Sequence, residues 1–534
     1  MNMSMFIGTG RLFLVMLRKE RVRLPIWAVS ISVLFLLSIL SFPETYPTQE
    51  DRQGRALLLE SPALRAMAGP GYGLENYTFG AMITNEMFLY VAVAVAFMSI
   101  FMIVRNTRAE EENGLSELIK AGVVGRISVT TAAFLLMVLA NLFVAAVVIF
   151  GMPYTIEGLS WNGSLAFGLG VAGVGIIFGA VSLFMAQMSE SAGAATGISS
   201  ALLGLAFLLR AIGDVAGVDA WRWMSPIGWG QAMRAFVDER WWPLGLFAGG
   251  IVLLAAAAMY IDYRRDDAAG VLRVQGGKAR AGSGLTHLLG LQSFLFRWVF
   301  LSWAAGAALY GVAMGAVSEE AADFFADNPI GEEFLVQAEG ATLAESLFAT
   351  YMAFLAMLAA GYALQVMTRM TREEKSGRGE ILLVQSVPRP RWMLDYLLIS
   401  CTGSFMLLVI SGIGAGTLYG YYTDSAEGAW KVFFAAIAQT PAVWVFIGLA
   451  ALLMGLWPKA LSLVWLVYTA FTLIGLIGPL LQLPDWVNDV SPYAQIPGVP
   501  AEDWTAWSTV ILFSVFAVFT VVGMYTIRKR DLII

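Results

Sequence analysis

The stretch VTTAAFLLMVLANLFVAAVVIFGM, residues 129–152, is almost entirely apolar and carries no charged side chain. A helix needs roughly 20 predominantly apolar residues to cross the hydrocarbon core of a bilayer. Residues 243–262 form a second run that is long enough. Neither run shows the strict alternation of a membrane-barrel strand, whereas a helix pairs its own backbone groups in lipid. Both runs therefore predict membrane-spanning helices.

The composition of the whole chain leads to the same class. Of the 534 residues, 58% are hydrophobic and only 13% are charged, and the mean hydropathy is +0.71. A soluble domain carries about 25% charged residues, so this chain has too few to coat a soluble protein. A single cysteine, Cys401, and a single histidine, His287, argue against a disulfide framework or a metal site. The net charge of −6 gives no sign of a nucleic-acid partner, and none is expected.

Apolar runs of this kind predict an all-α integral membrane protein with about twelve transmembrane helices. The first twenty residues hold no long apolar core, so no cleaved signal peptide is expected. The expected spans lie near 25–43, 85–104, 129–152, 164–188, 192–213, 243–262, 298–317, 346–368, 393–420, 429–455, 459–482 and 506–527.

Lysine and arginine are distributed unevenly between the segments that join these spans. Cytoplasmic loops of membrane proteins carry an excess of both residues. If both termini are cytoplasmic, most of the 33 Lys and Arg fall inside, and the outer segments hold only Arg52, Arg55, Arg65, Arg222, Arg234 and Arg240, with Arg210 and Lys431 near the outer edge. The bias predicts a multi-pass protein with both termini in the cytoplasm.

Three pairs of segments match at similar spacing, which indicates an internal duplication. The chain is expected to form two parallel six-helix repeats, 1–263 and 296–534, joined by a cytoplasmic linker at 264–295. The matched pairs are Glu110-Glu111…Gly114…Glu117-Leu118…Arg126 with Glu373-Glu374…Gly377…Glu380-Ile381…Arg389, Ser225-Pro226 with Ser491-Pro492, and Met259-Tyr260…Arg265-Asp266 with Met524-Tyr525…Arg530-Asp531.

The loops after the second span of each half read RAEEENGLSELIKAGVVGR (108–126) and REEKSGRGEILLVQSVPRPR (372–391). Each begins with carboxylates, turns at a glycine and continues as a short amphipathic helix, with Leu115, Leu118 and Ile119 on one face of the first. Such a helix can insert into a groove on a soluble partner or lie on the lipid surface. Two copies at matched positions favour a docking element.

These loops resemble the signature loop of type-2 ABC transporter permeases. The Ser-Pro element within MSPIGWGQAMRAF (224–236) and the six spans per half are also similar to that family. The fused twelve-span form resembles bacterial polyketide-antibiotic or multidrug efflux permeases. The second half departs from the pattern, because Arg378 and Gly379 stand where the first half has Leu115 and Ser116.

The resemblance implies a permease subunit of an exporter in the bacterial inner membrane that moves an amphipathic, antibiotic- or drug-like compound outward. The chain holds no G-x-x-x-x-G-K-[ST] sequence, so ATP and Mg²⁺ are expected on a separate ATP-binding subunit, in two copies, and no cofactor on this chain. The residues expected to couple to it are Glu110, Glu111, Gly114, Leu115, Glu117, Leu118, Glu373, Glu374, Gly377, Glu380 and Ile381.

The same resemblance places the substrate pathway on the second and fifth spans of each half, at Phe97, Met98, Phe101, Leu205, Phe207, Tyr351, Phe354, Met357, Tyr468 and Phe471. Met and aromatic side chains suit an apolar substrate, but for any single one helix packing is the better explanation. The expected outer-gate residues are Glu86, Glu345, Ser225, Pro226, Ser491 and Pro492. For Glu86 and Glu345, at matched outer starts of the second and eighth spans, a merely solvated carboxylate is an equal alternative. The Trp-rich outer stretch 214–242 is expected to form a re-entrant helical hairpin, as in the family.

Polar residues inside the spans are mostly uncharged. Interhelical hydrogen bonding is the favoured role of Asn141, Gln187, Gln365 and Gln439, and Gly175/Gly179 and Gly193/Gly197 allow close helix approach. Arg210 and Lys431 are expected to snorkel toward the outer surface.

Four other functions compete with that of a primary exporter of drug-like compounds. An ion-coupled secondary transporter usually has titratable residues deep in its spans, and a membrane enzyme needs convergent titratable residues. The sequence shows neither pattern. A lipid-translocating ABC permease and a non-transporting scaffold remain open alternatives.

Overall fold

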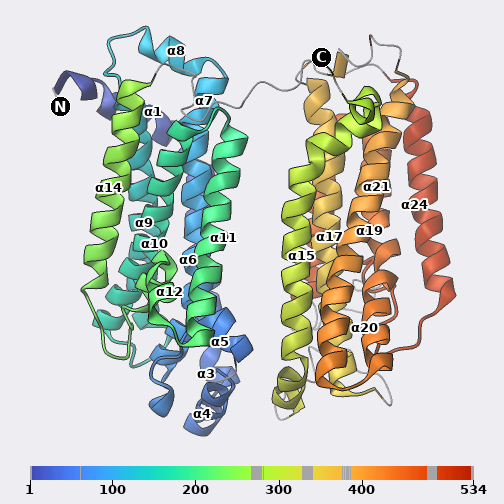
Figure 1. The fold of residues 1–534 in the computed structure, drawn as a ribbon, viewed down its shortest axis with the longest axis horizontal. Helices are drawn as coiled ribbons and strands as arrows, with labels where there is room; N and C mark the ends of the chain where they lie inside the picture. The colour runs from blue at the N-terminus through green and yellow to red at the C-terminus, as the bar shows by residue number, and fades with distance from the viewer. Residues whose placement is uncertain are drawn as a thin grey trace. The chain divides into compact units, whose positions relative to one another are not determined.

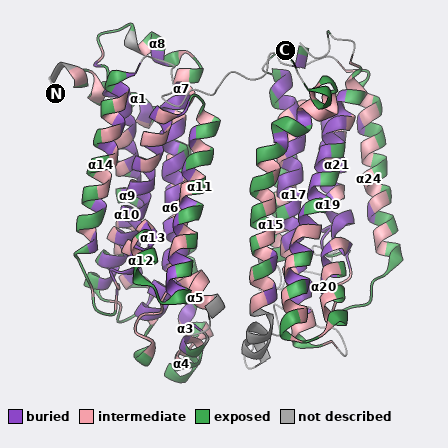
Figure 2. Ribbon diagram, viewed as in Figure 1, coloured by how far each residue is buried: buried purple, intermediate pink, exposed green. Residues whose placement is uncertain are grey.

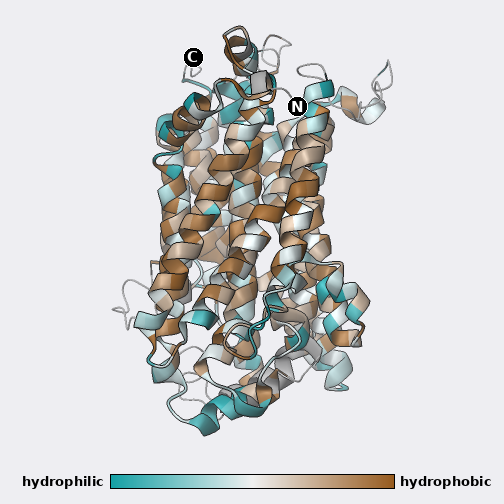
Figure 3. Cartoon of the chain, turned by 90° about the vertical axis from the view of Figure 1, so that its left-hand side faces the viewer, coloured by the Kyte–Doolittle hydropathy of each residue, from teal (hydrophilic) through white to brown (hydrophobic). Residues whose placement is uncertain are grey.

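The computed structural model describes residues 3–59, 62–265, 280, 282–326, 341–375, 377, 379–380, 384, 387–477 and 490–530. The regular structure in these ranges is helical. Within them, 12 helical segments are long and apolar enough to cross a membrane, and each overlaps one of the predicted spans. The predicted all-α class and number of spans are therefore confirmed. Hydrophobic residues gather along the middle of the helices and hydrophilic residues at both ends, as a bilayer requires (Figure 3).

The chain divides into two compact units, Met1–Gly277 and Lys278–Ile534. The long helices of the first unit enclose its core, and short helices cover their ends (Figure 1). Its α-helices are α1 (Thr9–Lys19), α2 (Arg23–Leu40), α3 (Phe42–Thr45), α4 (Gln49–Leu58), α5 (Pro62–Ala68), α6 (Phe79–Asn106), α7 (Arg108–Glu112), α8 (Leu115–Lys120), α9 (Ser128–Thr155), α10 (Trp161–Met188), α11 (Ala192–Ala216), α12 (Asp219–Trp223), α13 (Pro226–Gln231) and α14 (Pro243–Arg264).

Helices α6 and α10 form the centre of the first unit and are buried along most of their length (Figure 2). A Cβ atom at Gly175 of α10 would lie only 1.8 Å from Asn141 Oδ1 of α9, so glycine is required for this approach. Asn141 Nδ2 donates to Ser99 Oγ of α6 at 2.8 Å, which confirms the predicted interhelical hydrogen bond. Gly193 and Gly197 have no close neighbour within the first unit, so the close approach predicted there does not form inside this unit.

Arg210 of α11 is fully buried, so its predicted snorkelling to the outer surface is wrong. Its guanidinium donates to Asp214 Oδ2 at 3.1 Å and to the Ala66 carbonyl at 2.6 Å, and lies 5.0 Å from the centre of the Phe207 ring. A buried charge is stable only when it is paired and hydrogen-bonded, and α5 and α11 supply both needs. Lys431 is half exposed, as a snorkelling side chain would be.

The second unit is likewise a bundle of long helices. These are α15 (Leu288–Ala326), α17 (Leu343–Lys375), α19 (Arg389–Tyr422), α20 (Ala426–Ala438), α21 (Thr440–Leu456), α22 (Ser462–Ile477) and α24 (Ala506–Ile527). Helix α17 runs through its centre (Figure 2).

The fourth span of the second unit is interrupted near its middle. Helix α20 ends at Ala438 and α21 begins at Thr440, with Pro441 in its first turn. Proline has no N–H group and its ring clashes with the preceding turn, so it starts a helix better than it continues one. The fourth span of the first unit, α10, has no proline and runs without interruption.

The orientation predicted from the lysine and arginine distribution can be tested with single cysteines in a Cys401→Ser background. Val123 follows α8 and is 89% exposed, and Tyr154 lies at the far end of α9 and is 82% exposed. A membrane-impermeant maleimide should label Tyr154→Cys in intact cells and Val123→Cys only after permeabilisation. Labelling of Val123→Cys in intact cells would place the termini outside.

Candidate functional site

The predicted turn after the second span of the first unit forms at Gly114. Helix α7 ends at Glu112, and Gly114 adopts a left-handed conformation with φ of 73° before α8 begins at Leu115. The Gly114 N–H donates to the Glu111 carbonyl at 3.1 Å. Other L-residues pay roughly 1–2 kcal/mol in this region because Cβ meets the following carbonyl oxygen. The sequence thus sets a sharp turn that separates the carboxylates from α8.

The second unit contains the same turn at Gly377. Its φ is 74°, and its N–H donates to the Glu374 carbonyl at 3.1 Å. The next bond runs from the Glu380 N–H to the Gly377 carbonyl at 3.2 Å. Ile381, predicted to lie on the helix that follows, is outside the described residues.

Helix α8 divides its side chains between solvent and the bundle. Leu115 and Leu118 are 47% and 75% exposed, and Glu117 is also exposed. Ser116 is buried and Ile119 packs against the core of the first unit. The single apolar face predicted for Leu115, Leu118 and Ile119 is therefore wrong in part, because Ile119 anchors the helix. The exposed side chains among the described residues of α8 are Leu115, Glu117 and Leu118.

The carboxylates before Gly114 point into the first unit. Glu111 accepts from Arg108 Nη1 at 2.6 Å and also pairs with Arg265, which directly follows α14. Glu110 pairs with Lys19 at the end of α1. These two carboxylates therefore join the turn to the bundle, whereas Glu117 beyond the glycine is exposed.

The carboxylates before Gly377 are held in the same way. Glu374 accepts two hydrogen bonds from Arg530, at 2.7 and 2.8 Å, from the segment that follows α24. Glu373 accepts from the Tyr396 hydroxyl at 2.6 Å and from Arg369 Nε at 3.2 Å. Glu374 and Glu373 are buried, whereas Glu380 beyond the glycine is exposed.

A second arginine binds the backbone of the first in each unit. Arg126 Nη2 donates to the Arg265 carbonyl at 2.8 Å, and Arg389 Nη1 donates to the Arg530 carbonyl. In each unit, the loop therefore bonds to the end of the last span at two points. One contact is made by the carboxylate before the glycine, and the other by the arginine after it. We call these two sets the arginine latches; they consist of Glu111, Arg126 and Arg265 in the first unit and Glu374, Arg389 and Arg530 in the second.

The latches account for two of the matched sequence segments. Glu111, Glu374, Arg126 and Arg389 belong to the matched loops, and sequence reasoning singled out the carboxylates. It missed Arg265 and Arg530 as their partners, although both lie in the matched Met-Tyr…Arg-Asp segments. A glutamate and an arginine recur at matched positions in both halves, and this recurrence could have indicated that they pair.

The first latch also contacts the ends of the fourth and fifth spans. Arg265 Nε donates to Gln187 Oε1 in the last turn of α10 at 2.7 Å. Glu112 accepts from the backbone N–H of Ala192, the first residue of α11, at 2.7 Å. A displacement of the turn would therefore act on α10, α11 and α14 directly.

The predicted pathway residues lie on the expected helices but differ in exposure. In the first unit Phe97 stacks on Phe101 with 5.8 Å between ring centres. Leu205 is 49% exposed, Phe207 is half-buried, and Met98 is buried within the bundle.

In the second unit the predicted pathway residues belong to, or pack against, the hydrophobic core of that unit. Tyr468 donates to the Met357 carbonyl at 3.0 Å, and Phe471 lies on the same helix, α22. Tyr351 and Phe354 are half-buried on α17, whereas Met357 is buried. The substrate-contacting role of these ten residues stays a prediction.

The predicted outer-gate carboxylate Glu86 is engaged inside the first unit. It accepts two hydrogen bonds of 3.1 Å from Arg55 of α4 and one of 3.3 Å from the Tyr77 hydroxyl. Burial alone lowers the pKa of Arg55, but the charge of Glu86 and its hydrogen bonds outweigh burial and raise that pKa above its ordinary value. This pair fixes α4 on the start of α6.

Glu345 has a different role at the start of α17. It accepts from the Thr342 N–H at 2.9 Å, a capping-box contact, and lies 3.8 Å from Lys431 Nζ. The two Ser-Pro elements also differ. Ser225 and Pro226 begin α13, whereas Ser491 and Pro492 lie in a buried turn.

The Trp-rich stretch forms a short helical hairpin, α12 and α13, as expected from the family. Trp229 Nε1 donates to the Trp223 carbonyl at 2.7 Å, and Trp223 packs on Trp242 with 4.9 Å between ring centres. Helix α13 packs against α6, α10 and α11. The hairpin thus covers one end of the first unit's core.

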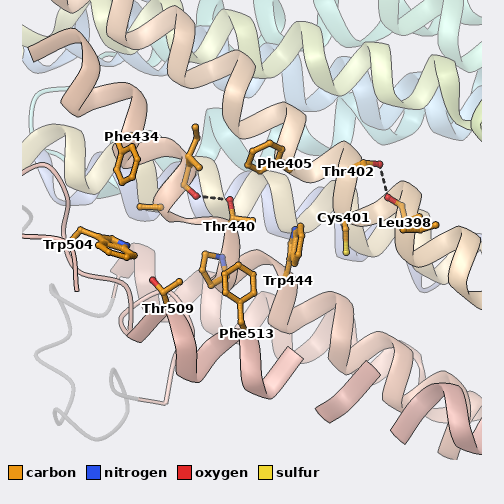
Figure 4. Close-up of a pocket in the computed structure, with 13 residues that line it drawn as sticks. Leu398, Cys401, Thr402, Phe405, Phe434, Thr440, Trp444, Trp504, Thr509 and Phe513 are labelled. Atoms are coloured by element: carbon orange, nitrogen blue, oxygen red, sulfur yellow. Dashed lines mark hydrogen bonds between the residues drawn. The ribbon is translucent and has the colours of Figure 1, made fainter. Parts of the chain in front are cut away.

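Sequence reasoning missed an apolar cavity of about 490 Å³ in the second unit. It lies among α19, α20, α21 and α24, at the interruption of the fourth span (Figure 4). The Thr402 hydroxyl donates to the Leu398 carbonyl of α19, and the Thr440 hydroxyl donates across the interruption to the Ile437 carbonyl of α20, both at 2.6 Å, so the wall is mainly apolar. Pro441 inside an otherwise apolar span was the signal that could have located it. The side chains around it include Cys401, Phe405, Phe434, Trp444 and Phe513.

Comparison with known proteins gives two matches. Residues 285–528 match the family described as multidrug efflux system permease Rv1217c, C-terminal domain. Over 532 residues the chain is 35% identical to the multidrug efflux system permease protein Rv1217c of Mycobacterium tuberculosis, which covers 99% of this chain and 96% of that protein. With its twelve apolar spans, the chain is a multi-pass membrane permease. It belongs to the family of the multidrug efflux system permease Rv1217c.

The second latch can be tested by a double-mutant cycle on Glu374→Gln and Arg530→Gln. Hydrogen bonds to charged groups contribute about 1.5–3 kcal/mol each, and residues in direct contact show coupling energies of 0.5–3 kcal/mol. Because this pair is bidentate and mostly buried, we expect a coupling energy of about 1–3 kcal/mol in reversible SDS unfolding of the purified chain.

The matched control is the exposed pair Glu427 and Lys431 of α20, 3.5 Å apart. Its coupling should stay below about 0.5 kcal/mol, as for other exposed i,i+4 pairs. Equal coupling at the two pairs would contradict a structural role for the latch.

Proposed function

We propose that this chain is the membrane-spanning permease subunit of an ABC-type exporter that moves amphipathic, drug-like compounds outward. A separate ATPase subunit, two copies per chain, binds ATP and Mg²⁺ and docks on the turns at Gly114 and Gly377. The observation that carries this proposal is the recurrence of the arginine latch beside an exposed Gly-x-x-Glu turn in both units. Membership in a family typified by a multidrug efflux permease supports the direction of transport.

The geometry of the first turn suits transmission of force from a soluble partner. Leu115 and Leu118 offer an apolar contact for a groove, and Glu117 offers a charge beside it. Behind them the turn is tied to the last span through Glu111 and Arg265. When the ATPase subunits close on ATP, movement of their grooves would shift α8, and the latch would carry that shift to α14.

The cavity beside Pro441 supports an amphipathic substrate. Small-molecule sites are typically cavities of about 300–1,000 Å³ that are lined mainly by apolar and aromatic side chains. Interrupted membrane helices often mark such sites, because they lie where a span departs from regular packing. The same cavity suits an acyl chain, so a lipid-translocating permease is the second candidate function.

An ion-coupled mechanism has less support. Such transporters use titratable side chains deep in their spans. The buried pair Arg210 and Asp214 lies in the last two turns of α11, and Arg210 also holds the Ala66 carbonyl. Its contacts join α5 to α11, which is a structural role.

Reversing the two exposed turn carboxylates tests the proposed docking. In the double variant Glu117→Lys, Glu380→Lys, like-charge contacts with a basic partner surface cost several kcal/mol. We expect the variant to insert in the membrane normally but to lose copurification of the ATPase subunit, or substrate-stimulated hydrolysis. The single variant Glu117→Lys should be the more damaging, because the first turn is closer to the family pattern.

The control is the double variant Glu157→Lys, Glu427→Lys, which reverses one exposed carboxylate in each unit away from the turns. It should assemble and transport as the unmodified protein does. If the turn variant does so too, the turns are not the docking element.

A further inference from the structure

A second cavity in the second unit is cationic. It measures about 290 Å³ and lies where the end of α17 meets the 3₁₀ turn Pro458–Ala460 and the start of α22. Arg372, Lys375 and Lys459 line it, together with Thr371, Ser462 and Trp465. No carboxylate lines it, and within the described ranges none of the three cations forms an ion pair.

The last turn of α17 separates its charges onto two faces. Glu373 and Glu374 are buried and bind Tyr396 and Arg530, away from the cavity. Arg372 and Lys375 are exposed and border the cavity. The carboxylates next to them in sequence are thus already engaged elsewhere, and the cavity keeps a net positive charge.

Thr371 adds a polar group that the protein itself leaves unsatisfied. Its side chain is 6% exposed and lines the cavity, and its Oγ1 has no hydrogen-bond partner among the described residues. Buried polar groups are rarely left unpaired, because each costs free energy when it loses its water. A hydroxyl donor beside three cations is arranged to bind an anion with several oxygen atoms.

The position of the cavity indicates where that anion comes from. The candidate spans Leu343–Lys375 and Pro458–Gly475 both have an end at this cavity. In a bilayer, the ends of transmembrane helices lie at the level of the lipid head groups. Trp457 and Trp465 are 62% and 37% exposed there, and tryptophan favours the interface. Basic pockets between transmembrane helices bind the phosphates of lipid head groups. We propose that this cavity binds the phosphate of an anionic phospholipid.

Lys375 lies two residues before the proposed docking turn at Gly377. Lipid binding at the cavity does not itself require the ATPase subunit, so it is tested on the purified full-length chain without that partner. The probes are dioleoyl phosphatidylglycerol, dioleoyl phosphatidylcholine and inorganic phosphate, with lipid retention measured by native mass spectrometry in detergent. The test variant is the triple Arg372→Gln, Lys375→Gln, Lys459→Gln. The control triple, Arg297→Gln, Arg528→Gln, Lys529→Gln, removes as much charge from exposed positions of the same unit outside the cavity.

Phosphatidylglycerol should bind the unmodified chain at least ten-fold more tightly than phosphatidylcholine with the same acyl chains. Each basic residue near the membrane surface contributes about 1 kcal/mol, so the test triple should lose on the order of a hundred-fold in affinity. The control triple should lose less than about three-fold. Thr371→Val, which keeps the shape, should lose about two- to ten-fold through one hydrogen bond.

Three outcomes would overturn the proposal. Equal losses in the two triples would mean general surface attraction rather than a site. Displacement of the lipid by inorganic phosphate at lipid concentrations would indicate a site for free phosphate. Unchanged lipid binding in the test triple, with loss of the copurified ATPase subunit, would make the cavity a protein contact. Failure of the ATPase proposal alone would leave the lipid result unaffected.

Discussion

The ion pair between a loop carboxylate and the arginine that ends the last span is the interaction on which each unit depends. Glu111 meets Arg265 and Glu374 meets Arg530, and in both units a second arginine binds the carbonyl of the first. The pairs lie at the ends of the spans with little exposure, where an unpaired charge would be costly. They close each bundle by joining the second span to the sixth. In the first unit, Glu110 and Glu112 of the turn also contact α1 and α11, and Arg265 contacts α10.

This arrangement separates the tasks of neighbouring carboxylates. Glu110, Glu111, Glu373 and Glu374 before the glycines are paired within their units, whereas Glu117 and Glu380 beyond the glycines are exposed. The glycine conformation enforces the division, since φ near +73° reverses the chain within one residue. In the proposed mechanism, a partner that binds the exposed residues after the glycine would therefore move a turn whose other end is bonded to the last span. The two units nevertheless differ in detail, because the fourth span of the second unit is interrupted at Pro441 whereas α10 is continuous. An apolar cavity lies beside that interruption, and a cationic cavity lies at the end of α17.

The spans, their number and the two turns could be predicted because long apolar runs and a glycine between carboxylates and a short helix act locally. The partners of Glu111 and Glu374 could not be predicted, because they lie 154 and 156 residues away and only the fold brings them together. Arg210 was misread for the same reason. Its position near a span end suggested snorkelling, but α5 supplies a carbonyl and Asp214 a carboxylate that keep it inside. Leu115 and Leu118 are exposed, whereas Ile119 packs against the core. A helical wheel shows which residues lie near one another on a helix, but not the direction in which the core lies.

The central claim is that each turn binds one ATP-binding subunit. It is tested most directly by the mass of the complex purified from its native membrane through a tag on this chain. Native mass spectrometry should give the 57.8 kDa chain plus two copies of one ATP-binding protein, and collisional activation should release those copies one at a time. A preparation that transports substrate while showing the mass of this chain alone, with its lipids, would contradict the claim.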